Sequence, residues 1–219
     1  MRGEEGVVNL PKELHCWDEF IEQKNSINPP KLKRIQAIFD FKSRWLISTR
    51  FKSLEVSIDF KDPLILQGHN VMTRLLFAWS ARECLSCALG RKVWELEIPD
   101  SKLSKDFHEK LYAGGKNQLI AETIYRGRLD GKQRQALERF QESPGSDIYP
   151  VLNVLRNASA HGSMTPTGAG LTQDENLIEL ISLGTKRLIL DSSERFGDWV
   201  KRDGLIQLVE DEKRERSTR

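Results

Sequence analysis

The chain has 219 residues, which favours one large domain or one domain with appendages. Lysine and arginine number 34 and aspartate and glutamate 32, so the net charge of +2 gives no global field that would indicate nucleic acid, and an anionic ligand needs a local cluster of cations. Three cysteines are too few for a disulfide framework, no apolar run approaches the roughly 20 residues of a membrane helix, and the N-terminus shows no signal peptide, so we predict a cytoplasmic protein without a membrane partner.

The first half of the chain shows mainly helical periodicity. Residues 1–29 are mixed in composition and are expected to form an N-terminal extension. Residues 31–60 follow as one long helix, or as two helices joined near Ser48. Residues 70–89 are apolar over much of the helical circumference, which predicts a central helix in the core with Gly90 as its C-terminal cap.

The second half begins with residues 93–98, which are predicted to be either a short strand or an extended linker. Helices are then expected over residues 101–112, 116–125, 130–141, 147–161 and 174–201. Gly184 and Gly197 weaken the last of these helices and are candidate positions for a bend. Residues 206–219 are nearly all charged or polar and are expected to form a disordered tail.

Because almost every element is helical, the sequence predicts an all-α fold, a helical bundle with additional N-terminal and intervening helices. No shift in composition divides the core, and no internal repeat is present. Residues 30–205 are therefore expected to form a single helical-bundle domain.

The segment at residues 156–162, which reads RNASAHG, contains the groups that phosphodiester cleavage needs. Arg156 is a cation, Asn157 is a polar orienting group and His161 carries a proton near neutral pH, and these are enough for cleavage without a metal. The segment ends a predicted helix at about residues 147–162. On a helical wheel the polar face holds, in angular order, Asn153, Arg156, Ala160, Asn157 and His161. This predicts an exposed strip of polar groups, with a small residue where a phosphate or a second helix can approach.

The wheel also limits what one copy of the chain can do. Arg156 and His161 lie roughly 140° apart around the helix, so a single copy offers one proton-transfer group. Cleavage of RNA through its own 2′-hydroxyl is easiest with a base, an acid and a cation, which two copies related by a twofold axis would supply. We therefore predict a homodimer. The prediction requires both side chains to face solvent in an open cleft. If either one is locked in an intramolecular salt bridge or closed off from bulk water, catalysis is excluded and only a helical scaffold remains.

Arg156-Asn157-x-x-x-His161, followed by Gly162, resembles the signature of the HEPN superfamily. The resemblance covers seven residues strictly, and the helical context extends it to about residues 70–201. It implies an up-down core of four to five helices with the motif near the end of a helix. It also implies a metal-independent endoribonuclease that cleaves single-stranded RNA across a dimer interface, in a toxin–antitoxin or antiviral setting. Other HEPN proteins have lost cleavage, so the alternative is an inactive module that binds RNA or a protein such as an antitoxin.

Two groups of residues have competing interpretations. Basic side chains that precede the motif helix are candidates for binding the RNA backbone: Arg126, Arg128, Lys132 and Arg134. The alternative for them is a solvated helix face balanced by neighbouring acids. For the motif itself, the alternative is that Arg156 and Asn157 fix helix packing while His161 caps the helix C-terminus.

Cys84 and Cys87 form a C-x-x-C pair on the apolar helix at residues 70–89. A structural zinc site needs four ligands, and nothing in the sequence positions a second pair. Two buried thiols are therefore the expected arrangement, and we predict neither a metal nor another cofactor.

Overall fold

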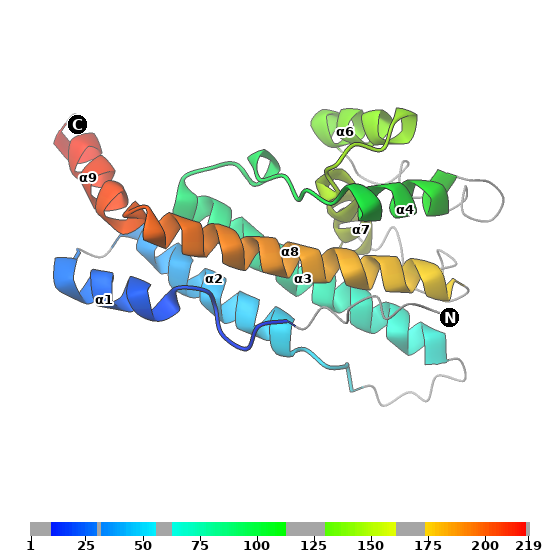
Figure 1. Cartoon of the computed structure of the whole chain (residues 1–219), viewed down its shortest axis with the longest axis horizontal. Helices are drawn as coiled ribbons and strands as arrows, with labels where there is room; N and C mark the ends of the chain where they lie inside the picture. The colour runs from blue at the N-terminus through cyan, green and yellow to red at the C-terminus, as the bar shows by residue number, and fades with distance from the viewer. Residues whose placement is uncertain (1–9, 30–31, 56–62, 113–129, 161–173, 218–219) are drawn as a thin grey trace.

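The computed structural model describes residues 10–29, 32–55, 63–112, 130–160 and 174–217, and within these ranges the protein is an all-α helical bundle, as predicted. Its elements are α1 (Trp17–Ile27), α2 (Lys33–Arg50), α3 (Pro63–Leu89), the 3₁₀ turn η1 (Val93–Glu95), α4 (Ser101–Tyr112), α6 (Gly131–Glu142), α7 (Tyr149–Ala160), α8 (Glu175–Lys201) and α9 (Gly204–Ser217). Helices α2, α3 and α8 run alongside one another as the long axis of the molecule (Figure 1). Helices α4, α6 and α7 gather over one end of this layer, and α1 and α9 lie at the other (Figure 1).

Helix α3 is the central element, in contact with α2, α7 and α8. Its length exceeds the prediction, since it begins at Pro63 rather than near residue 70. Gly90 ends it with a positive φ of 66°, and the amides of Gly90 and Arg91 donate to carbonyl oxygens of the last turn. This is the predicted glycine cap, because only glycine adopts that backbone conformation without strain. Helix α2 is a single helix that ends at Arg50, so the helical prediction over residues 31–60 is wrong for residues 51–55, which lie outside any helix.

A buried ion pair holds the chain between α3 and α4. Arg82, on α3, is fully buried, and its Nη1 donates to Oδ2 of Asp191 on α8 at 2.5 Å. Its Nη2 donates to the carbonyl oxygens of Leu96 and Glu97, at 2.5 and 3.2 Å. Residues 93–98 are therefore no strand. They form η1 and an extended segment whose carbonyl groups are tied to the core by one guanidinium.

The start of α7 is fixed against the same segment by Asp147. Its Oδ1 accepts hydrogen bonds from the amides of Ile98, at 2.7 Å, and Tyr149, at 2.9 Å. At Gly184 the close approach of α7 to α8 leaves no room for a side chain, because a Cβ there would lie 2.9 Å from Cδ2 of Leu152. Gly184 does not interrupt α8, which runs unbroken from Glu175 to Lys201.

The expectation of a disordered tail over residues 206–219 is wrong for most of that segment, because residues 204–217 form helix α9. Leu205, Leu208 and Val209 are buried, and their i, i+3, i+4 spacing gives α9 one apolar face. That face lies against α1 and α8. The apolar stripe is confined to the first turns of the helix, so the charged composition of the whole segment gave no indication of it.

Candidate functional site

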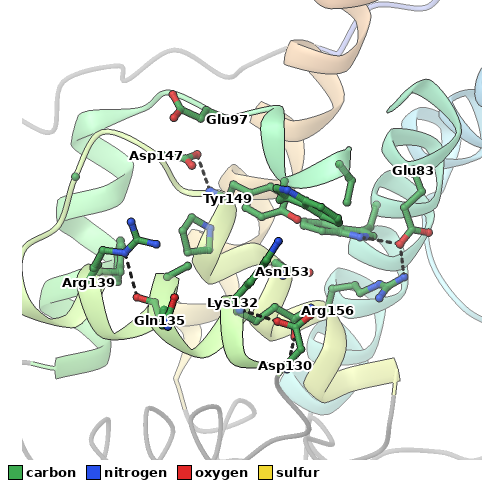
Figure 2. A pocket seen from close by; sticks show the side chains of 18 of the residues that line it. Glu83, Glu97, Asp130, Lys132, Gln135, Arg139, Asp147, Tyr149, Asn153 and Arg156 are labelled. Atoms are coloured by element: carbon green, nitrogen blue, oxygen red, sulfur yellow. Dashed lines mark hydrogen bonds and ion pairs between the residues drawn. The ribbon is translucent and has the colours of Figure 1, made fainter. Parts of the chain in front are cut away.

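Arg156 lies one turn before the end of α7 and reaches toward α3 (Figure 2). Its Nη1 donates to Oδ1 of Asn157 at 2.7 Å, and its Nη2 donates to Oε1 of Glu83 at 2.7 Å. The same Glu83 oxygen accepts from Nε1 of Trp79 at 3.1 Å, and the guanidinium carbon lies 5.8 Å from the Trp79 ring centroid. The side chain of Arg156 is 26% exposed and that of Glu83 41% exposed. Arg156 is thus oriented by three neighbours yet still in contact with solvent.

The polar strip predicted for α7 is only partly exposed. Asn153 and Asn157 are buried, at 5% and 6% exposure, so the prediction of an exposed strip is wrong for both. Val154 and Ala158 are buried as well, because α3, α6 and α8 all contact α7. Ala160 is exposed, in agreement with the wheel. Asn157 therefore acts on Arg156 from the protein interior.

The remaining candidate residues are divided between described and undescribed parts of the chain. His161, Arg126 and Arg128 lie outside the described residues. Lys132 and Arg134 are exposed on α6. Lys132 and Arg156 both line one cavity, which is described below. Arg134 is not among the residues that line it. The structure thus brings together two of the predicted site residues from different elements, Arg156 and Lys132.

The cavity has a volume of about 770 Å³ and is bordered by α3, η1, α6 and α7 (Figure 2). Three of its lining side chains are cations, namely Lys132, Arg139 and Arg156. Its lining aromatic residues are Trp79, Trp94, Phe140 and Tyr149. Carboxylates line it as well, so the cavity is not a uniformly basic channel. It combines cations with aromatic rings, and this combination suits a ligand with both phosphates and bases.

Most of the lining carboxylates are already engaged by the protein. Glu83 pairs with Arg156, and Asp130 caps α6 by accepting from the amide of Gln133 at 2.8 Å. Asp147 accepts from two backbone amides, and burial raises its pKa. Burial also raises the pKa of Tyr149 to about 12, so the Tyr149 hydroxyl is neutral at physiological pH and does not act as a base there.

The cavity contains an acid whose charge weakens the fold, and this gives a prediction about stability. Because burial raises the pKa of Asp147, the folded protein binds a proton at this carboxyl more tightly than the unfolded chain does. The free energy of unfolding therefore falls as the pH rises from the unfolded pKa of Asp147 through its folded pKa. Asp147→Asn retains the oxygen that accepts both amides, so we expect equal or greater stability than wild type at neutral pH. Asp147→Ala leaves the amides of Ile98 and Tyr149 without their acceptor and is expected to cost about 1–3 kcal/mol. Urea unfolding at neutral and acidic pH measures both. An Asn variant as unstable as the Ala variant would contradict this assignment.

Neither thiol of the C-x-x-C pair belongs to a metal site in the part of the chain that the structure describes. Cys87 is exposed and Cys84 is half-buried, so the prediction of two buried thiols is wrong for Cys87. Among the described residues no three histidine, cysteine or acidic side chains converge as metal ligands would.

Comparisons with known proteins assign neither a family nor a relative. No family model matches the chain, and no curated protein or solved structure is detectably similar to it. None of the described helices combines the length and apolar character needed to cross a membrane. The class that fold and site define is therefore an all-α bundle with an aromatic and cationic cavity around Arg156.

Proposed function

We propose that the chain is a HEPN-like endoribonuclease that cleaves single-stranded RNA as a homodimer, without a metal, in a cytoplasmic toxin or antiviral role. The proposal combines the RNASAHG motif with the position of Arg156 in a cavity that also holds aromatic rings. In this role Arg156 binds the scissile phosphate and its developing negative charge. Asn157 orients Arg156, and the hydrogen bond between them is the contact such a role requires.

The observation that carries the proposal is the Arg156 guanidinium, which is held in place at the cavity wall and whose contacts to other described residues leave N–H donors for a ligand. The two hydrogen bonds described for it use two of the five N–H donors of an arginine. A salt bridge that locks Arg156 in place would exclude catalysis, so the strength of its pair with Glu83 decides whether the guanidinium can bind a phosphate. A pair this exposed contributes about 0–1 kcal/mol, whereas a phosphate forms short, charge-assisted and often bidentate bonds with arginine. A phosphate therefore competes with Glu83 for the guanidinium.

The chemistry proceeds by transesterification within the RNA. His161 of one copy takes the proton from a 2′-hydroxyl, whose oxygen attacks the adjacent phosphorus. The bond from phosphorus to the 5′-oxygen breaks, and His161 of the second copy donates a proton to that leaving oxygen. The products are a 2′,3′-cyclic phosphate and a 5′-hydroxyl end, so no water and no metal take part.

The test is incubation of the wild-type protein and the His161→Ala variant with total RNA in the presence of EDTA, followed by analysis of the fragment ends. We expect cyclic phosphate ends with the wild type and cleavage at least about 100-fold slower with His161→Ala, because a proton-transfer group contributes 10²–10⁴-fold. Circular dichroism confirms that the variant is folded. Intact RNA with both proteins, or equal cleavage by both, would refute the nuclease.

The second candidate is an inactive module that binds RNA or a partner protein such as an antitoxin. The ion pair between Arg156 and Glu83 and the burial of Asn157 favour it, since both also serve the packing of α7 on α3. It predicts that wild type and His161→Ala bind RNA or the partner equally and leave RNA intact.

A further inference from the structure

Trp94 is a large aromatic side chain that the fold leaves in solvent. It is 51% exposed, whereas Trp45 and Trp79 are almost completely buried. It lies in η1 and lines the same cavity as Arg156. Single exposed apolar side chains are normal on protein surfaces, so the exposure of Trp94 gains meaning only from the cavity and the cations that accompany it.

The segment that carries Trp94 is firmly anchored. Arg82 binds the carbonyl oxygens of Leu96 and Glu97 from within the core, and Leu96 is fully buried. Within η1 itself, the carboxylate of Glu95 accepts from the amide of Lys92, the N-cap residue, at 3.1 Å. Trp94 is therefore presented on a fixed backbone, which lowers the entropy lost when a ligand binds to it.

Two cations from different elements accompany the ring. Nζ of Lys92 lies 5.3 Å from the ring centroid, and Nζ of Lys132, on α6, lies 5.2 Å from it. Both ammonium groups lie over the ring, so a base that stacks on Trp94 displaces at least one of these lysine side chains, which is then free to bind a phosphate. Aromatic rings combined with cations are what proteins use to bind single-stranded nucleic acid, through base stacking and contacts to the backbone. The nearby acids Glu95 and Asp130 bond to backbone amides and keep the local charge close to neutral, so stacking rather than net charge must supply most of the affinity.

We propose that Trp94 is a stacking site for a base of single-stranded RNA, with Lys92 and Lys132 binding the adjacent phosphates. The strand then continues along the cavity toward Arg156. This inference rests on the proposed function, because it assigns the RNA a path to the same site.

The test measures binding of a short fluorescein-labelled oligouridine by fluorescence anisotropy, in EDTA and in a His161→Ala background so that RNA is not consumed. We expect Trp94→Ala to raise Kd about tenfold, in line with the loss of one stacked base. Trp94→Phe keeps a ring and is expected to bind nearly as well as the parent. Ile47→Ala is the matched control, since Ile47 is 48% exposed on α2 and does not line the cavity. An oligomer without bases should bind the parent and Trp94→Ala equally.

An unchanged Kd for Trp94→Ala overturns the proposal, as does the absence of RNA binding by the parent. Loss of self-association in sedimentation, with Kd unchanged, would assign Trp94 to a contact between two copies instead. The nuclease proposal and the stacking proposal can fail separately. If RNA binding depends on Trp94 but the wild type leaves RNA intact, the nuclease is refuted and the stacking site stands. If the wild type cleaves RNA but binding does not depend on Trp94, the stacking site is refuted and the nuclease stands.

Discussion

Replacing Asp191 with alanine is expected to lower the free energy of unfolding by about 3–5 kcal/mol, because it leaves a buried guanidinium without its counter-ion. Arg82 is completely enclosed, and burial already lowers its pKa. Asp191 is itself buried and accepts from Arg82 and, at 2.7 Å, from Nε of Arg195. Without this carboxylate the fold must bury an uncompensated charge or open around α3 and α8. Urea unfolding of the variant and the wild type measures the loss.

Arg195→Ala is the matched control, since it removes the other cation that Asp191 binds. The Arg195 side chain is 30% exposed and also donates to the carbonyl oxygen of Glu97 at 2.7 Å, so Arg195→Ala loses charge-assisted hydrogen bonds worth about 1.5–3 kcal/mol but leaves no charge buried without a partner. Asp191→Ala removes both contacts and Arg195→Ala only the second, so the excess loss in Asp191→Ala measures the cost of leaving Arg82 buried without its counter-ion. Equal losses in the free energy of unfolding would show that the buried pair of Arg82 and Asp191 contributes no more than the contacts of Arg195.

Helix positions were predictable wherever a local signal marks the boundary. The helix expected over residues 101–112 is observed at those residues, and the one expected at 174–201 begins at Glu175 with Asp174 as its cap. Asp174 accepts from the amide of Leu177, and a contact between residues only three apart can be predicted from the local sequence. Gly90 is another such case. These signals are local, so a single sequence is enough to find them.

The features that shape the site depend on residues far apart in the chain. Arg82 and Asp191 are separated by 109 positions, and Glu83 and Arg156 by 73. A helical wheel gives the direction of Asn153 and Asn157 but not the helices that cover them. Periodicity likewise gives no indication that the side chain of Trp94 in η1 is exposed to solvent. One signal was present and missed, namely a tryptophan between two charged residues, Lys92 and Glu95, in a segment without clear helical pattern.

Replacing Arg156 with alanine is expected to slow RNA cleavage by about 10²–10³-fold, the loss typical when one preorganised donor to a developing negative charge is removed. Arg156→Lys keeps the charge but loses the planar fork that binds two phosphate oxygens, so its rate should lie between those of wild type and Arg156→Ala. Single-turnover cleavage at saturating protein measures this rate separately from binding. Equal rates in all three proteins would remove Arg156 from the reaction.

Glu83→Gln distinguishes a phosphate-binding arginine from a packing arginine. Glutamine still offers an oxygen to the Trp79 indole, and it removes the charge that competes with phosphate for Arg156. Because such a pair is worth about 1 kcal/mol at most, we expect RNA to bind up to about fivefold more tightly, with cleavage at least as fast as in wild type. If Arg156 serves only to hold α7 on α3, Glu83→Gln instead lowers the melting temperature and leaves RNA affinity unchanged. Anisotropy titration and thermal unfolding of the same preparation separate these outcomes.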